Sequence, residues 1–431
     1  MKNNVIWALL LSPFFSTAQS QEIAFEHGLS WQEVLQRAKK ENKYVFVDCY
    51  ATGCSPCNWM EKEVYSVDSV GTFMNERFIS VRVQMDTNRQ DTNEIRQWYS
   101  AGHDLKTKYD IGTYPSYLFF DPDGQAVHKD MGGKNIKEFL SMTRAAMDSR
   151  QQYYTLLAEY RKNNLSYRLM PVLADAAQRA GQDSISKRVG LYYIHHYLET
   201  LPAEQLWTQE NIFFVCSYSS YIGIADSIFQ LYYFNRANID AVMHEEHFSD
   251  RLINYVLYRD EVKPSIEKAV NVAAEPQWHQ IKKRMAKKFD VLYVNKNILQ
   301  SRVEYYKVKG RWGEYIKYFL QAREMDGIES WQAKIGNAYF LLNNDAFEVF
   351  KYDNNKRELK KALSWVNRAL AASDRPDPQV MDTKANLLYK LGKKAEALTL
   401  EKKSHALSPK DKDITANYEK MKNNLPTWLS E

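Results

Sequence analysis

The stretch that decides the fold is residues 44–60, YVFVDCYATGCSPCNWM. Its first seven residues form an apolar run typical of a buried β-strand, and a charged, helix-like segment follows from Glu61. Between the two lies a C-x-x-C motif, with thiols at Cys54 and Cys57. A thiol in the first turn of a helix faces free N–H groups and the positive end of the helix dipole, which favours the thiolate. A second thiol three residues later is near enough to close a disulfide, so the motif predicts a two-electron redox switch.

Further residues follow in the order that such a redox domain requires. Asp48 lies six positions before Cys54, on the predicted strand. The residues Thr-Tyr-Pro at 113–115 precede a second strand-like run at 116–120, and a Gly-Gly pair stands at 132–133. On this ordered set, residues 22–148 resemble a thioredoxin-fold domain, in the style of exported bacterial thioredoxin-like proteins that begin with an extra helix. The set is much more specific than a lone C-x-x-C, although it covers under a third of the chain.

The resemblance implies an α/β domain and assigns roles to its residues. Cys54 would attack a substrate disulfide as a thiolate, and Cys57 would resolve the mixed disulfide. Asp48 would lie below Cys57 and help to move its proton. The loop at 113–115 would hold the family's cis-proline and expose backbone groups beside the thiols, so the residues expected to bind substrate are Thr113, Tyr114 and Pro115. No cofactor and no metal ion is expected.

Three residues beside the thiols depart from the pattern of the family. Gly53 stands where the resemblance predicts Trp, Ser55 replaces Gly, and Asn58 replaces Lys. The first change removes a flat contact surface beside the nucleophile, and the last removes a nearby positive charge. Both changes leave substrate preference and redox potential open. The alternative is a degenerate fold that keeps only a structural disulfide.

Residues 1–20 are typical of a secretory signal peptide. Lys2 supplies the positive charge, residues 5–15 supply a short apolar core, and small residues at 16–20 allow cleavage after Ala18 or Ser20. The apolar run is too short to span a bilayer. A lipid anchor is not indicated, because no Cys stands at the expected cleavage point. The alternative is a buried N-terminal helix. We therefore expect an exported protein, in the periplasm or secreted.

Composition is that of a soluble globular protein with two or three domains. The 431 residues are 45% hydrophobic and 26% charged, and the net charge of +5 is small and spread along the chain, so no nucleic-acid or membrane-surface partner is indicated. The four cysteines are too few for a disulfide-stapled scaffold, which favours a functional C-x-x-C. We expect the other two, Cys49 and Cys216, to be core residues, with Cys49 on the strand face opposite Asp48.

The rest of the first domain shows helix and strand signals around the redox motif. Ser30 and Glu33 are spaced as a capping box at the start of a short amphipathic helix. Residues 78–83 alternate as a further strand. Residues 87–105 form a longer segment than the resemblance requires, which we interpret as an insertion that carries a helix. It either shapes the rim of the redox site or is a solvated surface loop.

After about residue 148 the pattern becomes helical throughout. We assign residues 21–148 to the thioredoxin-like domain, 149–300 to an all-α region and 301–425 to helical repeats, although residues 141–160 could be one helix that joins two domains. In the last part, Ala385, Ala397, Ser404 and Pro409 have spacings of 12, 7 and 5 residues, with Gly392 in a turn. These spacings resemble tetratricopeptide repeats. The small residues serve either helix packing alone or a concave groove that binds a protein partner.

Other chemical motifs are not indicated. His244 and His247 do not have the spacing of zinc-protease ligands, and no phosphate-binding loop or serine nucleophile elbow is present. The sequence therefore favours an exported thiol–disulfide oxidoreductase that acts on disulfides of envelope proteins, is recharged by a membrane-borne thiol donor, and carries a helical partner-binding module. The second hypothesis is a non-catalytic adaptor, in which the helical repeats bind a protein and the thioredoxin fold is a platform. Whether the dithiol reduces, oxidises or isomerises stays open, because tens of millivolts decide it.

Overall fold

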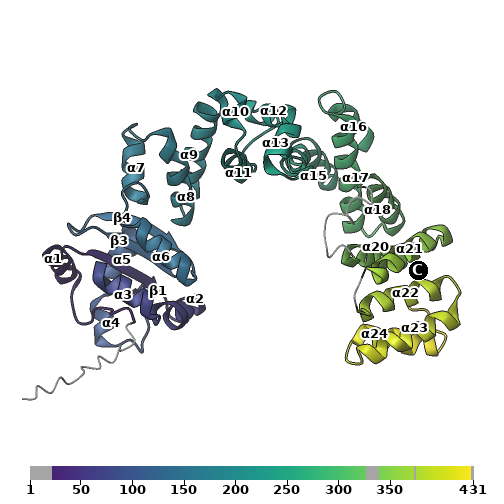
Figure 1. The fold of residues 1–431 in the computed structure, drawn as a ribbon, viewed down its shortest axis with the longest axis horizontal. Helices are drawn as coiled ribbons and strands as arrows, with labels where there is room; N and C mark the ends of the chain where they lie inside the picture. The colour runs from purple at the N-terminus through teal and green to yellow at the C-terminus, as the bar shows by residue number, and fades with distance from the viewer. Residues whose placement is uncertain (1–21, 327–338, 373–374, 429–431) are drawn as a thin grey trace, which may run out of the picture. The chain divides into compact units, whose positions relative to one another are not determined.

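The computed structural model describes residues 22–326, 339–372 and 375–428, so the predicted signal segment lies outside the described residues. The chain divides into two compact units, one up to Phe248 and the other from Ser249 (Figure 1). The first unit begins with an α/β domain and continues as helices, and the second is helical in its described residues. None of the described helices is both long and apolar enough to cross a membrane.

The α/β domain is built on four strands. Their bounds are β1 (Tyr44–Tyr50), β2 (Phe78–Gln84), β3 (Ser116–Phe120) and β4 (Ala126–Met131). The strand order is β2-β1-β3-β4, with β1 parallel to β2 and antiparallel to β3, and β3 antiparallel to β4. The register places Asp48 opposite Arg82 on β2 and Tyr117 on β3. The buried acid of the redox motif therefore sits in the middle of the sheet, between these two neighbours.

Helices cover both faces of this sheet (Figure 1). They are α1 (Trp31–Glu41), α2 (Ser55–Met60), the π-helical turn η1 (Glu61–Tyr65), α3 (Asp68–Arg77), α4 (Asn93–Gln97), α5 (Tyr99–Lys108) and α6 (Ile136–Ala145). One core joins Phe46 and Tyr117 of the strands to Met60, Met74 and Phe139 of α2, α3 and α6. The core on the other face joins alternate strand residues to α1 and α5. This two-layer cover is the α/β architecture that the resemblance implied.

Several local predictions are confirmed and two are corrected. The capping box of Ser30 and Glu33 is present at the start of α1, and Cys49 is buried in the core on the face opposite that of Phe46 and Tyr117. The solvated-loop interpretation of residues 87–105 is wrong for its second half, because Trp98 and Leu105 are buried against the sheet. One helix over 141–160 is also wrong. α6 ends at Ala145, and α7 begins only at Tyr153.

Helices that follow the α/β domain cover the edge strand β4. They begin with α7 (Tyr153–Arg161), η2 (Tyr167–Leu169), α8 (Met170–Arg179) and α9 (Asp183–His196). The backbone N–H of Tyr153 donates to Nδ1 of His128 on β4 at 3.1 Å, and Arg179 on α8 lies 4.0 Å from the buried carboxylate of Asp130. Because an uncovered edge strand invites pairing with other chains, these helices complete the domain as well as extend it.

The remaining helices of the first unit are short. They are η3 (Leu198–Thr200), α10 (Ala203–Leu206), α11 (Gln209–Ser217), α12 (Ser227–Phe234) and α13 (Arg236–Met243). Cys216 lies on α11, half-buried, with its sulfur 3.6 Å from the hydroxyl of Tyr232. Gly190 on α9 leaves room for the ring of Tyr218. The hydroxyl groups of Tyr218 and Ser186 share a hydrogen bond of 3.0 Å. Aromatic side chains therefore fill the contacts between these short helices.

The second unit consists of packed helices. Its first members are α14 (Asp250–Leu257), the π-helical turn η4 (Tyr258–Val262), α15 (Lys263–Asn271) and α16 (Trp278–Met285). Its longer members are α17 (Val291–Val308), α18 (Trp312–Asp326), α20 (Tyr339–Tyr352), α21 (Lys356–Ala371), α22 (Pro378–Lys390), α23 (Lys394–Leu407) and α24 (Lys412–Lys422). Ala385 of α22 and Ala397 of α23 are fully buried in one cluster, and Gly392 has a positive φ in the turn between the two helices. The packing role of these small residues is present, and their identity as tetratricopeptide repeats stays a prediction.

Candidate active site

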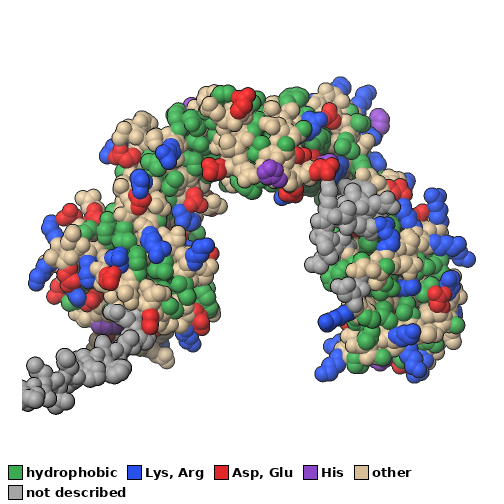
Figure 2. All heavy atoms as spheres, in the orientation of Figure 1, with side chains coloured by type: hydrophobic (Ala, Val, Ile, Leu, Met, Phe, Trp, Pro, Cys, Tyr) green, Lys and Arg blue, Asp and Glu red, His purple; other side chains and the backbone are tan. Residues whose placement is uncertain are grey.

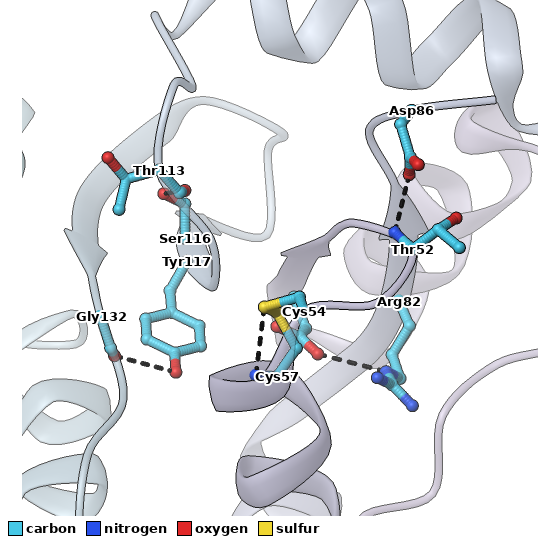
Figure 3. The surroundings of a disulfide bond; sticks show 10 residues. Thr52, Cys54, Cys57, Arg82, Asp86, Thr113, Ser116, Tyr117 and Gly132 are labelled. Atoms are coloured by element: carbon cyan, nitrogen blue, oxygen red, sulfur yellow. Dashed lines mark hydrogen bonds and ion pairs between the residues drawn. A yellow bond between two sulfur atoms is a disulfide. The ribbon is translucent and has the colours of Figure 1, made fainter.

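The two thiols of the C-x-x-C motif are joined in a disulfide (Figure 3). Cys54 is the N-cap of α2, and its Sγ accepts a hydrogen bond from the backbone N–H of Cys57 at 3.2 Å. Cys57 is 2% exposed, whereas Cys54 is half-buried. The sulfur that an incoming disulfide can reach is therefore that of Cys54. The buried Cys57 is placed to attack only its neighbour.

The turn before Cys54 explains one departure from the family. Gly53 has a φ of 72°, a left-handed conformation that side chains with a Cβ disfavour. The N–H of Thr52 donates to Oδ1 of Asp86 at 3.0 Å, which fastens the turn to the end of β2 (Figure 3). Pro56 follows in the first turn of α2, where a helix has no use for a backbone N–H. The turn therefore presents the first thiol at the start of a helix, as the sequence predicts, with glycine in place of Trp for a backbone reason.

Asp48 is 1% exposed and forms an ion pair with Arg82. Nε of Arg82 lies 3.2 Å from Oδ2 of Asp48, and Nη1 of the same guanidinium lies 3.0 Å from Oε1 of Glu61. Burial raises the pKa of Asp48 to about 6, while the charge of Arg82 lowers it. At neutral pH the carboxyl is mostly ionised, and it retains enough basicity to accept a proton from a thiol.

Arg82 and Glu61 were missed by the sequence reasoning, although one signal was available. Arg82 is the one charged residue of the strand FISVRVQ, where the pattern otherwise predicts apolar or neutral residues. A charge in a buried strand requires a partner, and Asp48 stands in the neighbouring parallel strand. What the sequence could not supply was the register that puts these two residues opposite each other.

Two tyrosines complete the surroundings of Asp48. Tyr117 is its register partner on β3, and its hydroxyl donates to the carbonyl of Gly132 at 3.2 Å (Figure 3). Tyr65 lies on η1, and its hydroxyl lowers the pKa of Asp48. Burial, with the charge of Asp48 as a further cause, raises the pKa of both phenols. Both rings therefore stay neutral at physiological pH and contribute polarity without charge.

The loop predicted to bind substrate reaches the redox turn through the diglycine loop. The peptide bond between Tyr114 and Pro115 is cis, as the resemblance implied. The carbonyl of Pro115 accepts the N–H of Gly132 at 2.8 Å, and a Cβ built on Gly133 would lie 3.9 Å from Cβ of Pro56. Thr113 is exposed, and its carbonyl accepts the Ser116 hydroxyl at 2.6 Å (Figure 3). The structure thus links residues 113–115 to the C-x-x-C helix, while their contact with substrate stays a prediction.

A small cavity lies beside the redox turn. It has a volume of about 300 Å³ and lies between the end of β2, with Met85 and Asp86, and helix α5, with Tyr99, His103 and Lys106. Asp86 is the residue that holds Thr52, and Lys106 lies 5.8 Å from the ring centroid of Tyr114. Residues of the segment 87–105 therefore line a cavity next to the residue that holds the redox turn, while their role at the rim of the redox site stays a prediction.

The other candidate chemistries find no support in the described residues. Cys49 is fully buried, and burial raises the pKa of its thiol well above the ordinary value, so it is not an available nucleophile. Within residues 22–326, 339–372 and 375–428, no cluster of three or more His, Cys, Asp or Glu side chains is arranged to hold a metal ion. The chemistry of the site is therefore that of a dithiol–disulfide pair beside a buried carboxyl.

Comparisons with known proteins agree with this geometry. Residues 27–122 match the family model described as thioredoxin-like. A relative from Rattus norvegicus, spermatogenesis-associated protein 20, is 36% identical over 64 residues, which are 15% of this chain and 8% of that protein. The uncharacterized protein B0495.5 of Caenorhabditis elegans is 29% identical over 105 residues, 24% of this chain and 13% of that protein. The chain thus spans only a small part of these curated relatives.

Solved structures similar to the chain align over about its first third. A candidate disulphide-isomerase from Bacteroides thetaiotaomicron is 31% identical and aligns with a TM-score of 0.26, covering 31% of this chain and 98% of that one. The oxidoreductase DsbH is 17% identical with a TM-score of 0.26, covering 34% of this chain and 94% of the other. The strand order and the family match show that residues 27–122 belong to a thioredoxin-like domain, and a largely helical region follows that domain in the chain.

Proposed function

We propose that the protein is an exported thiol–disulfide oxidoreductase that reduces or exchanges disulfides of envelope proteins through Cys54 and Cys57. The observation that carries this proposal is the disulfide itself, with a half-buried sulfur at a helix start and its buried partner in the first turn. A purely structural disulfide needs no such asymmetry. The ion pair of Asp48 and Arg82 in the same domain adds a buried base, which a degenerate fold would have no reason to keep.

The reductive reaction follows in two steps. The Cys54 thiolate attacks one sulfur of a substrate disulfide, which releases the other substrate sulfur as a thiolate and forms a mixed disulfide. Cys57 then loses its proton and attacks Sγ of Cys54, which releases the second substrate thiolate and forms the Cys54–Cys57 disulfide. Two electrons pass from the dithiol to the substrate, and the two thiol protons follow to its sulfurs. The structure holds the oxidised product of this reaction.

Asp48 is proposed as the proton acceptor for Cys57 in the second step. Its pKa of about 6 leaves the carboxyl mostly ionised at neutral pH, and its burial keeps it basic compared with an exposed Asp. The N–H of Cys57, which donates to Sγ of Cys54 in the oxidised form, lies where it would also stabilise a Cys54 thiolate. The two thiols are thus treated differently by their surroundings, as their two roles require.

Export and renewal of the dithiol belong to the same proposal. The pattern of residues 1–20 supports export, most simply to a periplasm. A dithiol that reduces substrates in an oxidising compartment needs a thiol donor, for which we propose a membrane-borne protein. The helices after the domain supply a separate surface for a protein partner, in keeping with their resemblance to tetratricopeptide repeats.

The decisive experiment measures insulin-disulfide reduction and the equilibrium redox potential of the mature protein together. We expect dithiothreitol-driven insulin reduction that Cys54→Ser abolishes and Cys216→Ser leaves unchanged. A redox potential of about −270 mV would mark a reductant. A potential of about −120 mV would mark an oxidant that donates disulfides. Absence of a reversible two-electron couple would overturn the proposal and favour the adaptor. A Cys54/Cys57 double variant that still supports the cellular phenotype would do the same.

A further inference from the structure

Arg82 is shared between two carboxylates of different exposure. Its Nε lies 3.2 Å from Oδ2 of the buried Asp48, and its Nη1 lies 3.0 Å from Oε1 of Glu61, whose side chain is 54% exposed. The guanidinium also lies over the rings of Tyr50 and Phe25, at 4.7 and 5.7 Å from their centroids. Its planar fork can meet one carboxylate on each of two edges, so the buried acid and the surface acid are joined by one cation.

Glu61 comes from the helix that carries the resolving thiol. It follows Cys57 by four residues and is the first residue of the π-helical turn η1, which continues α2 without a break. The last residue of that turn is Tyr65, whose hydroxyl also acts on Asp48. π-Helical turns are wider than α-helical turns and occur often at functional sites. This one directs side chains from both of its ends to the same ion pair.

We propose that Glu61 is a positioning residue of the redox site, which holds the Arg82 guanidinium on Asp48 and ties that pair to the Cys57 helix. This inference rests on the proposed function, in which Asp48 takes the proton of Cys57. By its hold on Arg82, Glu61 sets how readily the buried carboxyl gains and loses its proton. Its main action on Asp48 passes through Arg82, and the direct effect of its own charge on that carboxyl is smaller.

The charged and titratable groups that face Asp48 come from four elements. They are Arg82 on β2, Tyr117 on β3, Tyr65 and Glu61 on η1, and Tyr50 on β1 itself. The thiol of Cys49, next to Asp48 in the chain, lies on the other face of the sheet. Arg82 is the one cation among them. Its Coulomb attraction opposes the burial of Asp48, so a guanidinium that turned towards water would leave the carboxylate poorly compensated.

Removal of Glu61 has two opposite effects on the pKa of Asp48, and their sizes differ. Loss of a like charge lowers that pKa, but Glu61 is half in water, where its field is screened. Loss of the anchor frees a guanidinium that acts on Asp48 at 3.2 Å in the protein interior, where charges interact more strongly. The second effect is the larger, so truncation of Glu61 raises the pKa of Asp48.

The test follows the Asp48 carboxyl directly, in the oxidised full-length protein. Aspartate labelled with ¹³C at the carboxyl is titrated by NMR, and the Asp48 signal is assigned from its loss in Asp48→Asn. We expect Glu61→Ala to raise the pKa of Asp48 by roughly one pH unit. Glu61→Gln should largely rescue it, because its amide oxygen still accepts from Arg82. The matched control is Glu63→Ala, an exposed glutamate two residues along the same helical turn, which should leave the titration unchanged.

Two results would overturn the inference. One is an Asp48 titration that Glu61→Ala leaves where it is, and the other is an equal change in Glu63→Ala. Because the NMR titration does not require catalytic turnover, the pKa of Asp48 can be measured whether or not the protein reduces disulfides. If the protein does not reduce insulin but Glu61→Ala still raises the pKa of Asp48, the proposed function is rejected and the positioning role of Glu61 stands. If both hold, the pH profile of insulin reduction should move towards higher pH in Glu61→Ala and return in Glu61→Gln.

Discussion

At the scale of single residues, Asp48 links the electrostatics of the site to its chemistry. A carboxyl that is buried beside one arginine has a pKa of about 6 instead of about 4, because burial disfavours its charged form more than Arg82 favours it. The sequence places Asp48 on a strand before the thiols. The pKa depends on neighbours from β2, β3 and η1, which no local pattern reveals.

Replacement of Asp48 by Asn tests this residue. In the wild-type protein we expect kcat/KM for insulin reduction to rise with pH through a step near pH 6, as the carboxyl ionises and becomes able to accept a proton. Asp48→Asn should lose that step, and its kcat/KM at pH 7 should be lower by a factor of roughly ten or more. Asp123→Asn, an exposed change in the β3–β4 turn, is the control. A step near pH 6 that survives in Asp48→Asn would show that another group titrates there.

At the scale of elements, close packing of short helices holds the first unit together after the α/β domain. Gly190 of α9 is the clearest case, because a Cβ at this position would lie 2.2 Å from the ring of Tyr218. That ring is fixed by a hydrogen bond to the Ser186 hydroxyl, so it cannot simply move aside. The glycine is required for close approach of two segments and not for a turn.

Gly190→Ala should therefore destabilise this part of the chain. We expect a loss of about 1–3 kcal/mol in the free energy of local unfolding, as for overpacked cores. Hydrogen exchange of the full chain, resolved by segment, measures it, with faster exchange in α8, α9 and α11 and little change in β1 and β2. Gly313→Ala in α18, where a Cβ meets nothing within 4 Å, is the matched control. Unchanged exchange in α9 would contradict the packing argument.

At the scale of the whole molecule, the chain combines two units that carry different buried acids. The second unit contains Asp382 on α22 and Glu401 on α23, with 6% and 0% exposure. Burial raises the pKa of both carboxyls, that of Glu401 to about 9. The charge of Asp382 raises the pKa of Glu401 further, whereas Glu401 lowers that of Asp382. A group whose pKa is higher in the folded than in the unfolded protein stabilises the fold at low pH. That stabilisation is lost as pH rises through the folded value, so this unit should weaken in alkali.

Glu401→Gln should remove much of that alkaline sensitivity. As pH rises from 7 to 10, we expect wild-type hydrogen exchange in α22 and α23 to accelerate beyond the intrinsic effect of pH, and the variant to change less. The α/β domain should serve as an internal reference. The control is Glu396→Gln, because Glu396 lies on the same helix but its side chain is 56% exposed. This variant should behave as wild type. Equal alkaline sensitivity in wild type and Glu401→Gln would mean that other groups weaken the unit.

Much of this protein was determined by the sequence alone. The order of a strand, Asp48, C-x-x-C, a Thr-Tyr-Pro loop and two glycines was enough for the α/β class of the first domain, because each feature depends on local backbone and side-chain chemistry. The capping box of Ser30, the opposite face of Cys49 and the helical character after residue 148 follow from the same short-range rules. The pairing of Cys54 with Cys57 needed only their spacing.

Only the tertiary structure decided what surrounds those thiols. Arg82 reaches Asp48 because two parallel strands share a register, and Glu61 reaches Arg82 because a helix packs across that sheet. The covering of β4 by α7 and α8 depends on contacts between residues far apart in the chain. So does the burial of Trp98, in a segment that the sequence also allows as a solvated loop. Such contacts follow from how elements pack and not from local periodicity, and they determine the pKa of the buried acid on which the proposed chemistry depends.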